Sequence, residues 1–316
     1  KAAPSKAMHH LIRRPLLALG IATGLGVAGL AASQSTEGMG KPNLAANWGS
    51  SSEKAIRPAA PNRTDIPWFQ TLVDQATPGS ILKPPPGDYA GPVLVDKPLT
   101  IDGGGKVTID GGGKGTVFVI DTKGATLRGV HLKGSGESHD SDDACLNVRG
   151  DHHVVEGIVI DDCLFGIDLK QANHNVIREN RISSKPFELG VRGDGLRLWY
   201  SNHNLIEKNE VIDSRDMVAW YANHNVYLGN IGKRSRYSIH FMFAKDSVVE
   251  GNSFYDNAVG VYLMYTERIH LRNNIISHAT GATGMGLGFK ESSDSEVENN
   301  EIIYCAIGVR SEERRV

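Results

Sequence analysis

The chain has 316 residues, with 34 basic and 36 acidic side chains and a net charge of -2. A charge this close to neutral argues against general nucleic-acid binding, which needs a basic surface. Glycine is frequent, at 36 residues, but without the period of three that defines collagen. Three cysteines cannot all pair with one another, and they are too few for a disulfide scaffold. The composition therefore indicates a turn-rich chain that forms two average domains or one elongated domain.

Residues 1–33 resemble a secretion signal. Arg13 and Arg14 supply positive charge, and residues 15–32 are uncharged and rich in Leu, Ala and Gly. The run ends in small residues that suit signal cleavage. Because its length is near the lower limit for a membrane span, an uncleaved anchor remains an alternative. We expect this segment to direct export, and the small, polar residues 34–65 to form a flexible linker.

Residues 66–77 have apolar side chains at helical spacing, including Phe69, Leu72 and Val73. We expect a short helix here. It precedes an array of repeats, and an open end of such an array exposes unpaired strand edges. The helix is therefore predicted to cap the N-terminal end of the array.

Residues 78–309 contain a repeat of about 22 residues. Its clearest mark is an asparagine at positions 180, 209, 230, 252, 274 and 300. Between these positions lie short apolar runs that alternate with period two and are separated by Gly, Asn, Asp or Ser, so no run reaches helical length. Short strands in a repeat of this length predict an all-β fold, a right-handed, single-stranded parallel β-helix like that of pectate lyases. The asparagines are then expected to form a hydrogen-bonded ladder from coil to coil.

The repeating pattern stops near residue 309. Residues 310–316 are mostly charged and do not continue it. We expect them to be a non-native tail on a truncated chain, although an ordinary charged tail is the alternative.

The alternation in the strands predicts which side chains face the interior. The positions 167/169/171, 196/198/200, 217/219/221, 239/241/243 and 261/263/265 are mostly apolar and are expected to point inward. The residues between them are expected to point outward. This outward set includes Asp168, Arg197, Trp199, Trp220, His240, Met242, Tyr262 and Met264.

The cysteines are expected to be small, buried, unpaired residues. Cys163 and Cys305 occupy the same place in coils that lie far apart, and Cys145 is aligned with the inward-facing Ile167. No Cys-x-x-Cys motif is present, which argues against a thiolate zinc site.

Four histidines fall at one position of successive coils: His152, His174, His203 and His224. Strand spacing would stack them about 5 Å apart. One interpretation is turn chemistry between asparagines, and the other is a metal site.

Two motifs in consecutive coils carry a family resemblance. Residues 238–243 (Ser-Ile-His-Phe-Met-Phe) and 260–265 (Gly-Val-Tyr-Leu-Met-Tyr) resemble the NosD family of periplasmic copper-processing proteins. Residues 86–93, 109–113 and 193–199 are similar to the broader family of carbohydrate-binding and sugar-hydrolase β-helices. The resemblance covers residues 78–309.

The resemblance to the NosD family implies a periplasmic protein that is not an enzyme. It implies work with an ABC transporter, meaning its ATPase and its membrane permease. It also implies that copper comes from a chaperone lipoprotein and serves the copper centre of nitrous oxide reductase.

His240, Met242 and Met264 are the predicted copper ligands. His240 and Met242 share one face of a strand, and Met264 is expected one coil further on. Imidazole and thioether groups suit Cu(I), so transient Cu(I) binding is expected, with Trp220 covering the ion. The histidine column is the second choice. A hydrophobic docking patch for a partner protein is the alternative interpretation.

A carbohydrate-active enzyme or a sugar-binding module is the competing class. Glycosidases need a pair of carboxylates, for which Asp142–Asp143 and Asp161–Asp162 are candidates. The Gly-His-Gly and Arg-Ile-Lys motifs of β-helix pectin hydrolases are missing, as is the Asp-Pro-His-Asp signature of epimerases. Outward aromatic residues indicate a contact surface for a sugar or a partner protein, here Trp199, Trp220 and Tyr262.

Overall fold

A computed structural model describes residues 54–281 and 283–312. The chain divides into two units, and every described residue belongs to the second, Ser50–Val316. The expected signal at 1–33, the linker residues 34–53 and the tail residues 313–316 lie outside the described part. Residues 54–65 form neither helix nor strand.

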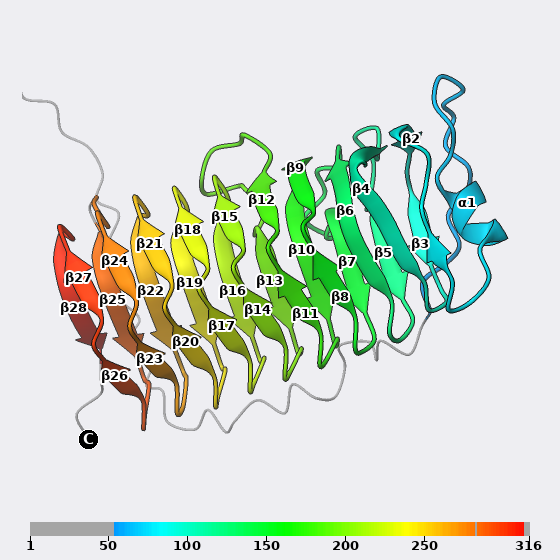
Figure 1. Ribbon diagram of the computed structural model, residues 1–316. Coiled ribbons are helices and arrows are strands. Elements are labelled where there is room, and N and C mark those ends of the chain that lie inside the picture. Colours follow the sequence, from blue (N-terminus) through cyan, green and yellow to red (C-terminus); the bar gives the residue numbers. More distant parts are fainter. Residues whose placement is uncertain (1–53, 282, 313–316) are drawn as a thin grey trace, which may run out of the picture. The chain divides into compact units, whose positions relative to one another are not determined.

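The described chain winds into a solenoid in which successive coils stack through parallel strands (Figure 1). Each coil contributes one strand to each of three faces, which we call A, B and C in the order in which the chain visits them. Strands that follow one another on a face are paired in parallel, as between β10 (Phe165–Lys170) and β13 (Leu196–Trp199). This arrangement confirms the predicted right-handed parallel β-helix.

Face A is a ten-stranded sheet. Its strands are β3 (Val93–Val95), β5 (Phe118–Asp121), β7 (Ala144–Arg149), β10, β13, β16 (Asp216–Trp220), β19 (Tyr237–Met242), β22 (Val259–Met264), β25 (Met285–Lys290) and β28 (Ile307–Glu312). The last strand therefore includes residues 310–312 of the expected tail, and β28 pairs with β25.

Faces B and C share the two long strands β4 (Thr100–Asp110) and β6 (Thr126–Lys133). Face B also contains β1 (Ile81–Leu82), β8 (Val154–Glu156), β11 (Val176–Arg178), β14 (Leu205–Glu207), β17 (Val226–Leu228), β20 (Val248–Glu250), β23 (His270–Arg272) and β26 (Glu296–Glu298). Face C also contains β2 (Gly87–Ala90), β9 (Val159–Cys163), β12 (Arg181–Ser184), β15 (Glu210–Ile212), β18 (Ile231–Lys233), β21 (Ser253–Tyr255), β24 (Ile275–Ser277) and β27 (Glu301–Ile303).

One short helix, α1 (Gln70–Gln75), is found among the described residues and lies at the N-terminal end of the solenoid (Figure 1). It falls within the range 66–77 expected to be helical and is six residues long. Phe69 and Val73 are buried against the first coils, and Gln70 exchanges hydrogen bonds with the backbone of Leu94. These contacts hold α1 against the first coils.

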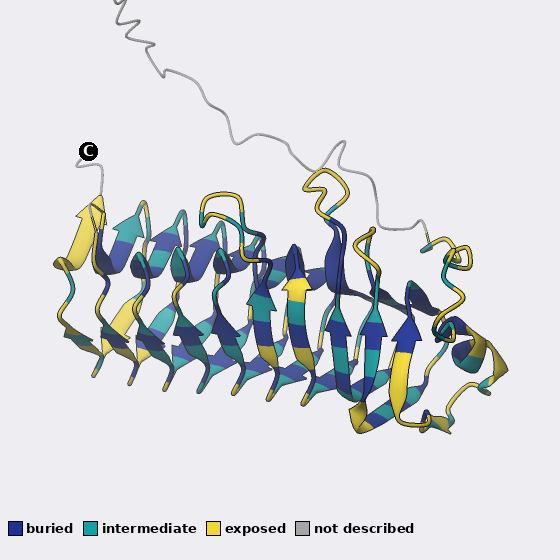
Figure 2. Ribbon diagram, turned by 90° about the horizontal axis from the view of Figure 1, so that it is seen from above, coloured by how far each residue is buried: buried dark blue, intermediate teal, exposed yellow. Residues whose placement is uncertain are grey.

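The core runs along the inside of the solenoid (Figure 2). Side chains alternate between core and surface along the strands, so that Ile167, Leu169, Leu196 and Leu198 are all fully buried. The predicted inward pattern therefore holds for the first two positions of each set. It is wrong for the third position, because Gln171, Tyr200, Tyr221, Phe243 and Tyr265 have positive φ and sit in the turn that leaves face A.

The asparagine ladder is confirmed at the corner between faces B and C. In each rung, the side-chain oxygen of one asparagine accepts both the backbone and the side-chain N–H of the equivalent residue one coil earlier. Asn209 donates in this way to Asn230 at 2.9 and 3.0 Å. The ladder links Asn180, Asn209, Asn230, Asn252, Asn274 and Asn300.

Coil length varies, and the extra residues lie at the corner between faces C and A. Ladder partners are separated by 29, 21, 22, 22 and 26 residues. The long first step contains the loop 185–195, between β12 and β13, and the last contains the segment 278–284, between β24 and β25. A third loop at this corner, 134–143, meets the first through a contact from His139 Nε2 to the Val191 carbonyl at 3.0 Å.

Two of the three cysteines form a disulfide, so the prediction that they are unpaired is wrong. Cys145 in β7 is bonded to Cys163 at the end of β9, with their Cα atoms 5.6 Å apart. The prediction compared only equivalent positions of different coils, whereas this bond joins non-equivalent positions, one on face A and one on face C, that are 18 residues apart. Leu146, and not Cys145, is the residue opposite Ile167. Cys305 is a free, half-buried thiol.

Candidate metal centre

The histidine and methionines predicted to bind copper lie on neighbouring strands of face A. β19 and β22 pair so that His240 is opposite Tyr262 and Met242 is opposite Met264. His240 Nε2 lies 3.1 Å from the sulfur of Met264. The structure thus brings the imidazole and one thioether into contact, with the second thioether on the strand partner of the first.

The surroundings of this pair are aromatic and largely closed to solvent. His240 is 7% exposed, while Met242 and Met264 are half-buried. The ring of Tyr237 lies 4.7 Å from the imidazole and that of Tyr262 lies 5.9 Å away. An imidazole nitrogen and a soft thioether sulfur form a donor set that favours Cu(I) over hard cations.

The contact is slightly too short to hold an ion without movement. Bond lengths of about 2.0 Å to nitrogen and 2.3 Å to sulfur, typical of a d¹⁰ ion, place the two donors about 3.5 Å apart at a tetrahedral angle. The observed separation of His240 and Met264 is 3.1 Å. A shift of a few tenths of an ångström therefore opens the site.

A buried carboxylate lies behind His240. Asp216 in β16 is 1% exposed, and its Oδ2 is 3.8 Å from Nδ1 of His240. Its Oδ1 accepts hydrogen bonds from Arg236 Nε at 3.0 Å and from the Tyr237 backbone at 3.2 Å. Burial would raise the pKa of Asp216, but the contacts with His240 and Arg236 outweigh burial and lower it. The carboxylate is thus ionised at neutral pH.

Asp194 is a second buried carboxyl on this side of the solenoid. It lies next to Arg215, whose Nε is 3.9 Å from Asp194 Oδ1 and 4.0 Å from Asp216 Oδ2. Neither Asp194 Oδ1 nor Arg215 Nε has a hydrogen-bond partner within the described chain. Burial and the neighbouring charge of Asp216 raise the pKa of Asp194 to about 7.

Sequence reasoning missed these two carboxylates and their arginines. The only signal is their position, since Asp194, Arg215 and Asp216 stand where the chain enters face A, just ahead of the apolar alternation. A charged pair at a strand entrance is common in any solenoid turn, so the sequence gives no reason to prefer it. The structure singles them out by burial.

The expected contact residues Trp199, Trp220 and Tyr262 are half-buried on face A. The two indole rings lie 4.7 Å apart, and Trp220 is the strand partner of Met242. Trp220 therefore stands in the coil before Met242, as predicted, and its role in covering an ion stays a prediction. Beside these residues the turn side chains form a continuous stack with ring centroids 4.8–4.9 Å apart, made of Tyr200, Tyr221, Phe243 and Tyr265.

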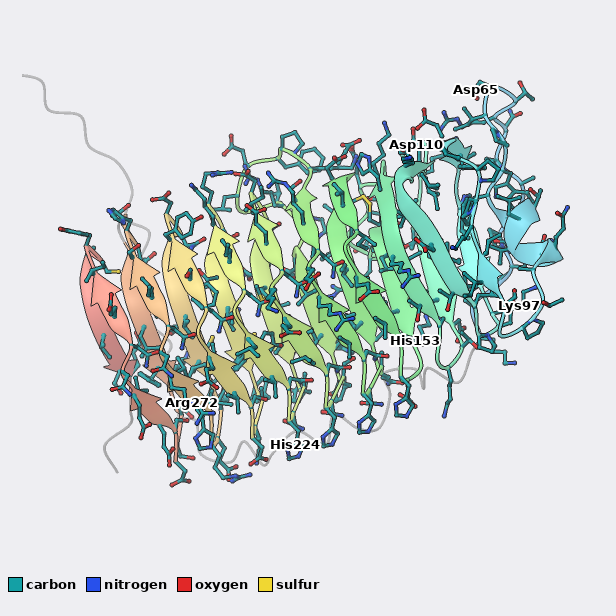
Figure 3. All side chains as sticks on the ribbon, viewed as in Figure 1. Asp65, Lys97, Asp110, His153, His224 and Arg272 are labelled. Atoms are coloured by element: carbon teal, nitrogen blue, oxygen red, sulfur yellow. A yellow bond between two sulfur atoms is a disulfide. The ribbon has the colours of Figure 1, made fainter. Side chains whose placement is uncertain are left out.

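The four histidines of the second-choice site form the expected column at the corner between faces A and B. Neighbouring ring centroids are 4.7–5.2 Å apart, with interplanar angles of 4–14°. Figure 3 shows His224 at this turn edge. An ion bound by an imidazole lies in the ring plane, and parallel planes do not meet near the rings. Adjacent histidines therefore cannot share one ion unless a ring rotates.

All four histidines have φ of 56–63°, the left-handed conformation. Histidine is among the residue types enriched there, which supports the interpretation as turn chemistry. Within residues 54–281 and 283–312, no group of three or more His, Cys, Asp or Glu side chains is arranged to hold a metal ion.

The acidic pairs considered for catalysis are engaged in ion pairs. Asp142 contacts Lys170 at 2.7 Å and Arg197 at 2.9 Å. Asp161 contacts His131 at 2.9 Å, and Asp162 contacts Lys185 at 3.1 Å. Asp143 accepts hydrogen bonds from the backbone and hydroxyl of its own loop. Each of these carboxylates is therefore engaged by a neighbouring cation, by His131 or by its own loop.

The fold and the comparison with family models define the class. Residues 115–231 match the model of a right-handed β-helix region. Residues 179–315 match the model described as periplasmic copper-binding protein (NosD), and this range contains His240, Met242 and Met264. Together the two matches span residues 115–315 and support membership of the NosD-type family of right-handed β-helix proteins. No curated protein sequence matches the chain.

Several solved structures share the fold. An alginate lyase from Paenibacillus sp. str. FPU-7 is 15% identical, with a TM-score of 0.61 over 77% of this chain and 94% of the lyase. Tailspike protein 2 of the Escherichia coli O157:H7 bacteriophage CAB120 is 10% identical, with a TM-score of 0.59 over 73% of this chain and 35% of the tailspike. A double mutant of the periplasmic alginate epimerase AlgG is 14% identical, with a TM-score of 0.53 over 78% of this chain and 71% of the epimerase.

These structures contradict the prediction that the protein is not an enzyme. That prediction rested on the family resemblance alone, whereas a lyase and an epimerase are built on the same solenoid. Identities this low establish the shared fold only, and such a fold does not exclude catalysis. In the described part of the chain, no helix is both long and apolar enough to cross a membrane.

Proposed function

We propose that this protein handles copper in the periplasm and serves the maturation of the copper centre of nitrous oxide reductase. In this role it receives Cu(I) from a chaperone lipoprotein and works beside an ABC transporter with its ATPase and permease. Copper is cargo here, bound transiently by His240 and Met264 with Met242 as the third ligand.

The observation that carries the proposal is the contact of His240 Nε2 with the Met264 sulfur at 3.1 Å, inside the range matched by the copper-binding family model. A core or docking role would not require an imidazole nitrogen to face a thioether. Half-burial of the methionines leaves the sulfurs reachable by a partner that delivers or removes an ion. Two or three soft ligands also suit release better than a closed site of four.

The test is competition for Cu(I) with a chromophoric Cu(I) chelator. The triple variant His240→Ala, Met242→Leu, Met264→Leu keeps the surface apolar while removing the soft donors. A matched control, His270→Ala with Met217→Leu, removes one imidazole and one thioether elsewhere, from an ion pair with Glu296 and from the core. We expect the triple variant to lose Cu(I) retention and the control to keep it.

Unchanged Cu(I) retention in the triple variant would contradict this site. The histidine column is then the next place to test, through His174→Asn with His203→Asn, because asparagine tolerates the left-handed turn. If neither variant loses copper, the protein holds Cu(I) at neither of the two predicted sites.

Acid–base chemistry on a saccharide is the second candidate function. The observation that favours it is Asp194, a buried carboxyl whose pKa is raised to about 7 beside Arg215. A group with a pKa near neutrality is suited to general acid catalysis. Incubation with alginate or pectate, with Asp194→Asn as the matched variant, tests it. Turnover that disappears in Asp194→Asn supports catalysis, and no turnover of either polymer removes this candidate for those substrates.

A further inference from the structure

The imidazole of His240 lies between two coils. Its Nε2 faces Met264 in β22 at 3.1 Å, and its Nδ1 faces Asp216 in β16 at 3.8 Å. When Nε2 of a neutral imidazole binds a metal ion, the proton must sit on Nδ1, which then needs an acceptor. Among the described residues, the acceptor recorded near Nδ1 is the carboxylate of Asp216.

One small shift of the His240 ring would bring both its contact with Asp216 and its contact with Met264 to the lengths that a bound ion requires. A separation of 3.8 Å is about 0.8 Å longer than an ordinary N–H···O hydrogen bond. The contact with Met264 must widen by a few tenths of an ångström to admit an ion. A shift of the His240 ring away from β22 and towards β16 widens one contact and shortens the other.

Asp216 is itself held firmly in place. Both of its oxygens contact the guanidinium of Arg236, and the Tyr237 backbone donates to Oδ1. The shift in strand register between β16 and β19 falls between Asp216 and Val218, directly ahead of the position where Val218 opposes His240. The carboxylate is thus fixed by groups other than the histidine it faces.

We propose that Asp216 is a positioning residue for His240: its carboxylate accepts a hydrogen bond from Nδ1–H, so that the Nε2 lone pair points at a Cu(I) ion shared with Met264. This inference rests on the proposed copper function. It assigns to Asp216 no contact with the ion. The expected effect follows from outer-shell partners of metal-bound histidines, whose removal typically weakens metal affinity about 10- to 100-fold.

The experiment is a double-mutant cycle on Cu(I) affinity, measured by chelator competition. The proteins are the wild type, Asp216→Asn, His240→Ala and the double variant. Arg181→Gln is the matched control, because it removes an exposed arginine–carboxylate pair, with Glu210 at 2.6 Å, and leaves Asp216 and its partners unchanged. We expect Asp216→Asn to bind Cu(I) about 10- to 100-fold more weakly. In the His240→Ala background, Asp216→Asn should weaken Cu(I) binding further by no more than about twofold.

A second measurement uses the wild type, so it does not depend on how well a variant folds. Nitrogen-15 NMR of the Cu(I)-loaded protein reports which nitrogen of His240 carries the proton. We expect protonated Nδ1. A proton on Nε2 in the loaded protein would overturn the proposal.

The outcomes separate this inference from the copper function. If His240→Ala weakens binding while Asp216→Asn does not, or if Arg181→Gln weakens it as much as Asp216→Asn, Asp216 has no positioning role and the copper site stands. If the double variant loses as much Cu(I) binding free energy as the two single variants together, the two residues act independently, and this result also overturns the inference. If His240→Ala leaves Cu(I) affinity unchanged, the copper site itself is wrong, and the role of Asp216 falls with it.

Discussion

Asn230 is an interior rung of the asparagine ladder, and its replacement by alanine tests what the ladder contributes. Asn230 is fully buried. Its side chain donates to the Ile206 carbonyl at 2.8 Å and to Asn252 at 3.0 Å. Its oxygen accepts the backbone and side-chain N–H groups of Asn209 at 2.9 and 3.0 Å. Asn230→Ala removes all four hydrogen bonds at once.

The loss of stability in Asn230→Ala comes from the hydrogen-bonding groups that it leaves unpaired. Two N–H donors of Asn209 lose their acceptor in a place that water does not reach, and the Ile206 carbonyl loses one donor. A buried donor without an acceptor costs about 1–3 kcal/mol. Two such donors give about 4 kcal/mol, and alanine leaves a small cavity besides. We expect the free energy of unfolding to fall by about 4 kcal/mol.

Urea unfolding followed by far-ultraviolet circular dichroism measures this loss. Asn273→Gly is the control, because Asn273 is exposed at φ +57°, its side chain makes one 3.5 Å contact with Glu250, and glycine adopts this φ without strain. We expect the control to change stability by no more than about 0.5 kcal/mol. A loss below about 1 kcal/mol in Asn230→Ala would refute the reasoning, because buried unpaired donors cannot be that cheap.

Three further predictions concern stability. Replacing Cys145 and Cys163 by alanine opens a disulfide with a sequence separation of 18 residues, and we expect a loss of about 3 kcal/mol in urea unfolding; an unchanged midpoint would contradict it. Burial lowers the pKa of His203, as do the charges of His224 and His174, so the unfolded chain binds more protons than the folded chain as pH falls from about 6.5 towards the lowered pKa, and stability is lost in that direction. Because the ring is exposed, solvent screens the effect and the slope is shallow. His203→Asn should flatten this pH slope, and an equal slope in both proteins would speak against coupling within the column. The Tyr227 hydroxyl is buried without a hydrogen-bond partner in the described chain, so Tyr227→Phe should raise the thermal midpoint, with a gain of about 1 kcal/mol; a lower midpoint would show that the hydroxyl is satisfied.

The sequence was sufficient to predict the architecture because a solenoid repeats one local rule many times. The asparagine spacing defines the coils, and period-two alternation separates core from surface at Ile167 and Leu169 as it does at Leu196 and Leu198. The same rule placed Met242 opposite Met264. For these strands the register between neighbouring coils follows from the repeat, whereas at Cys145 the predicted alignment with Ile167 is wrong by one residue.

Contacts between positions that are not equivalent in the repeat could not be predicted in this way. The bond between Cys145 and Cys163 crosses a corner between different faces, and a column comparison never places the two together. The burial of Asp216 and Asp194 also depends on how Arg215 and Arg236 fold over them. Likewise, the turn residues from Tyr200 to Tyr265 look like inward strand positions until φ changes sign.

The variable coil length has a consequence for how this scaffold tolerates change. Extra residues enter at the corner between faces C and A, while the corner between B and C is held by the asparagine ladder. A chain of this design can lengthen the loops 134–143 and 185–195 without shifting a single column of the sheets. Those loops border the entrance to face A, where His240 and its neighbours lie. Selection can therefore reshape what approaches this face while the positions of the side chains on it stay constant, much as antibody loops vary on a fixed framework.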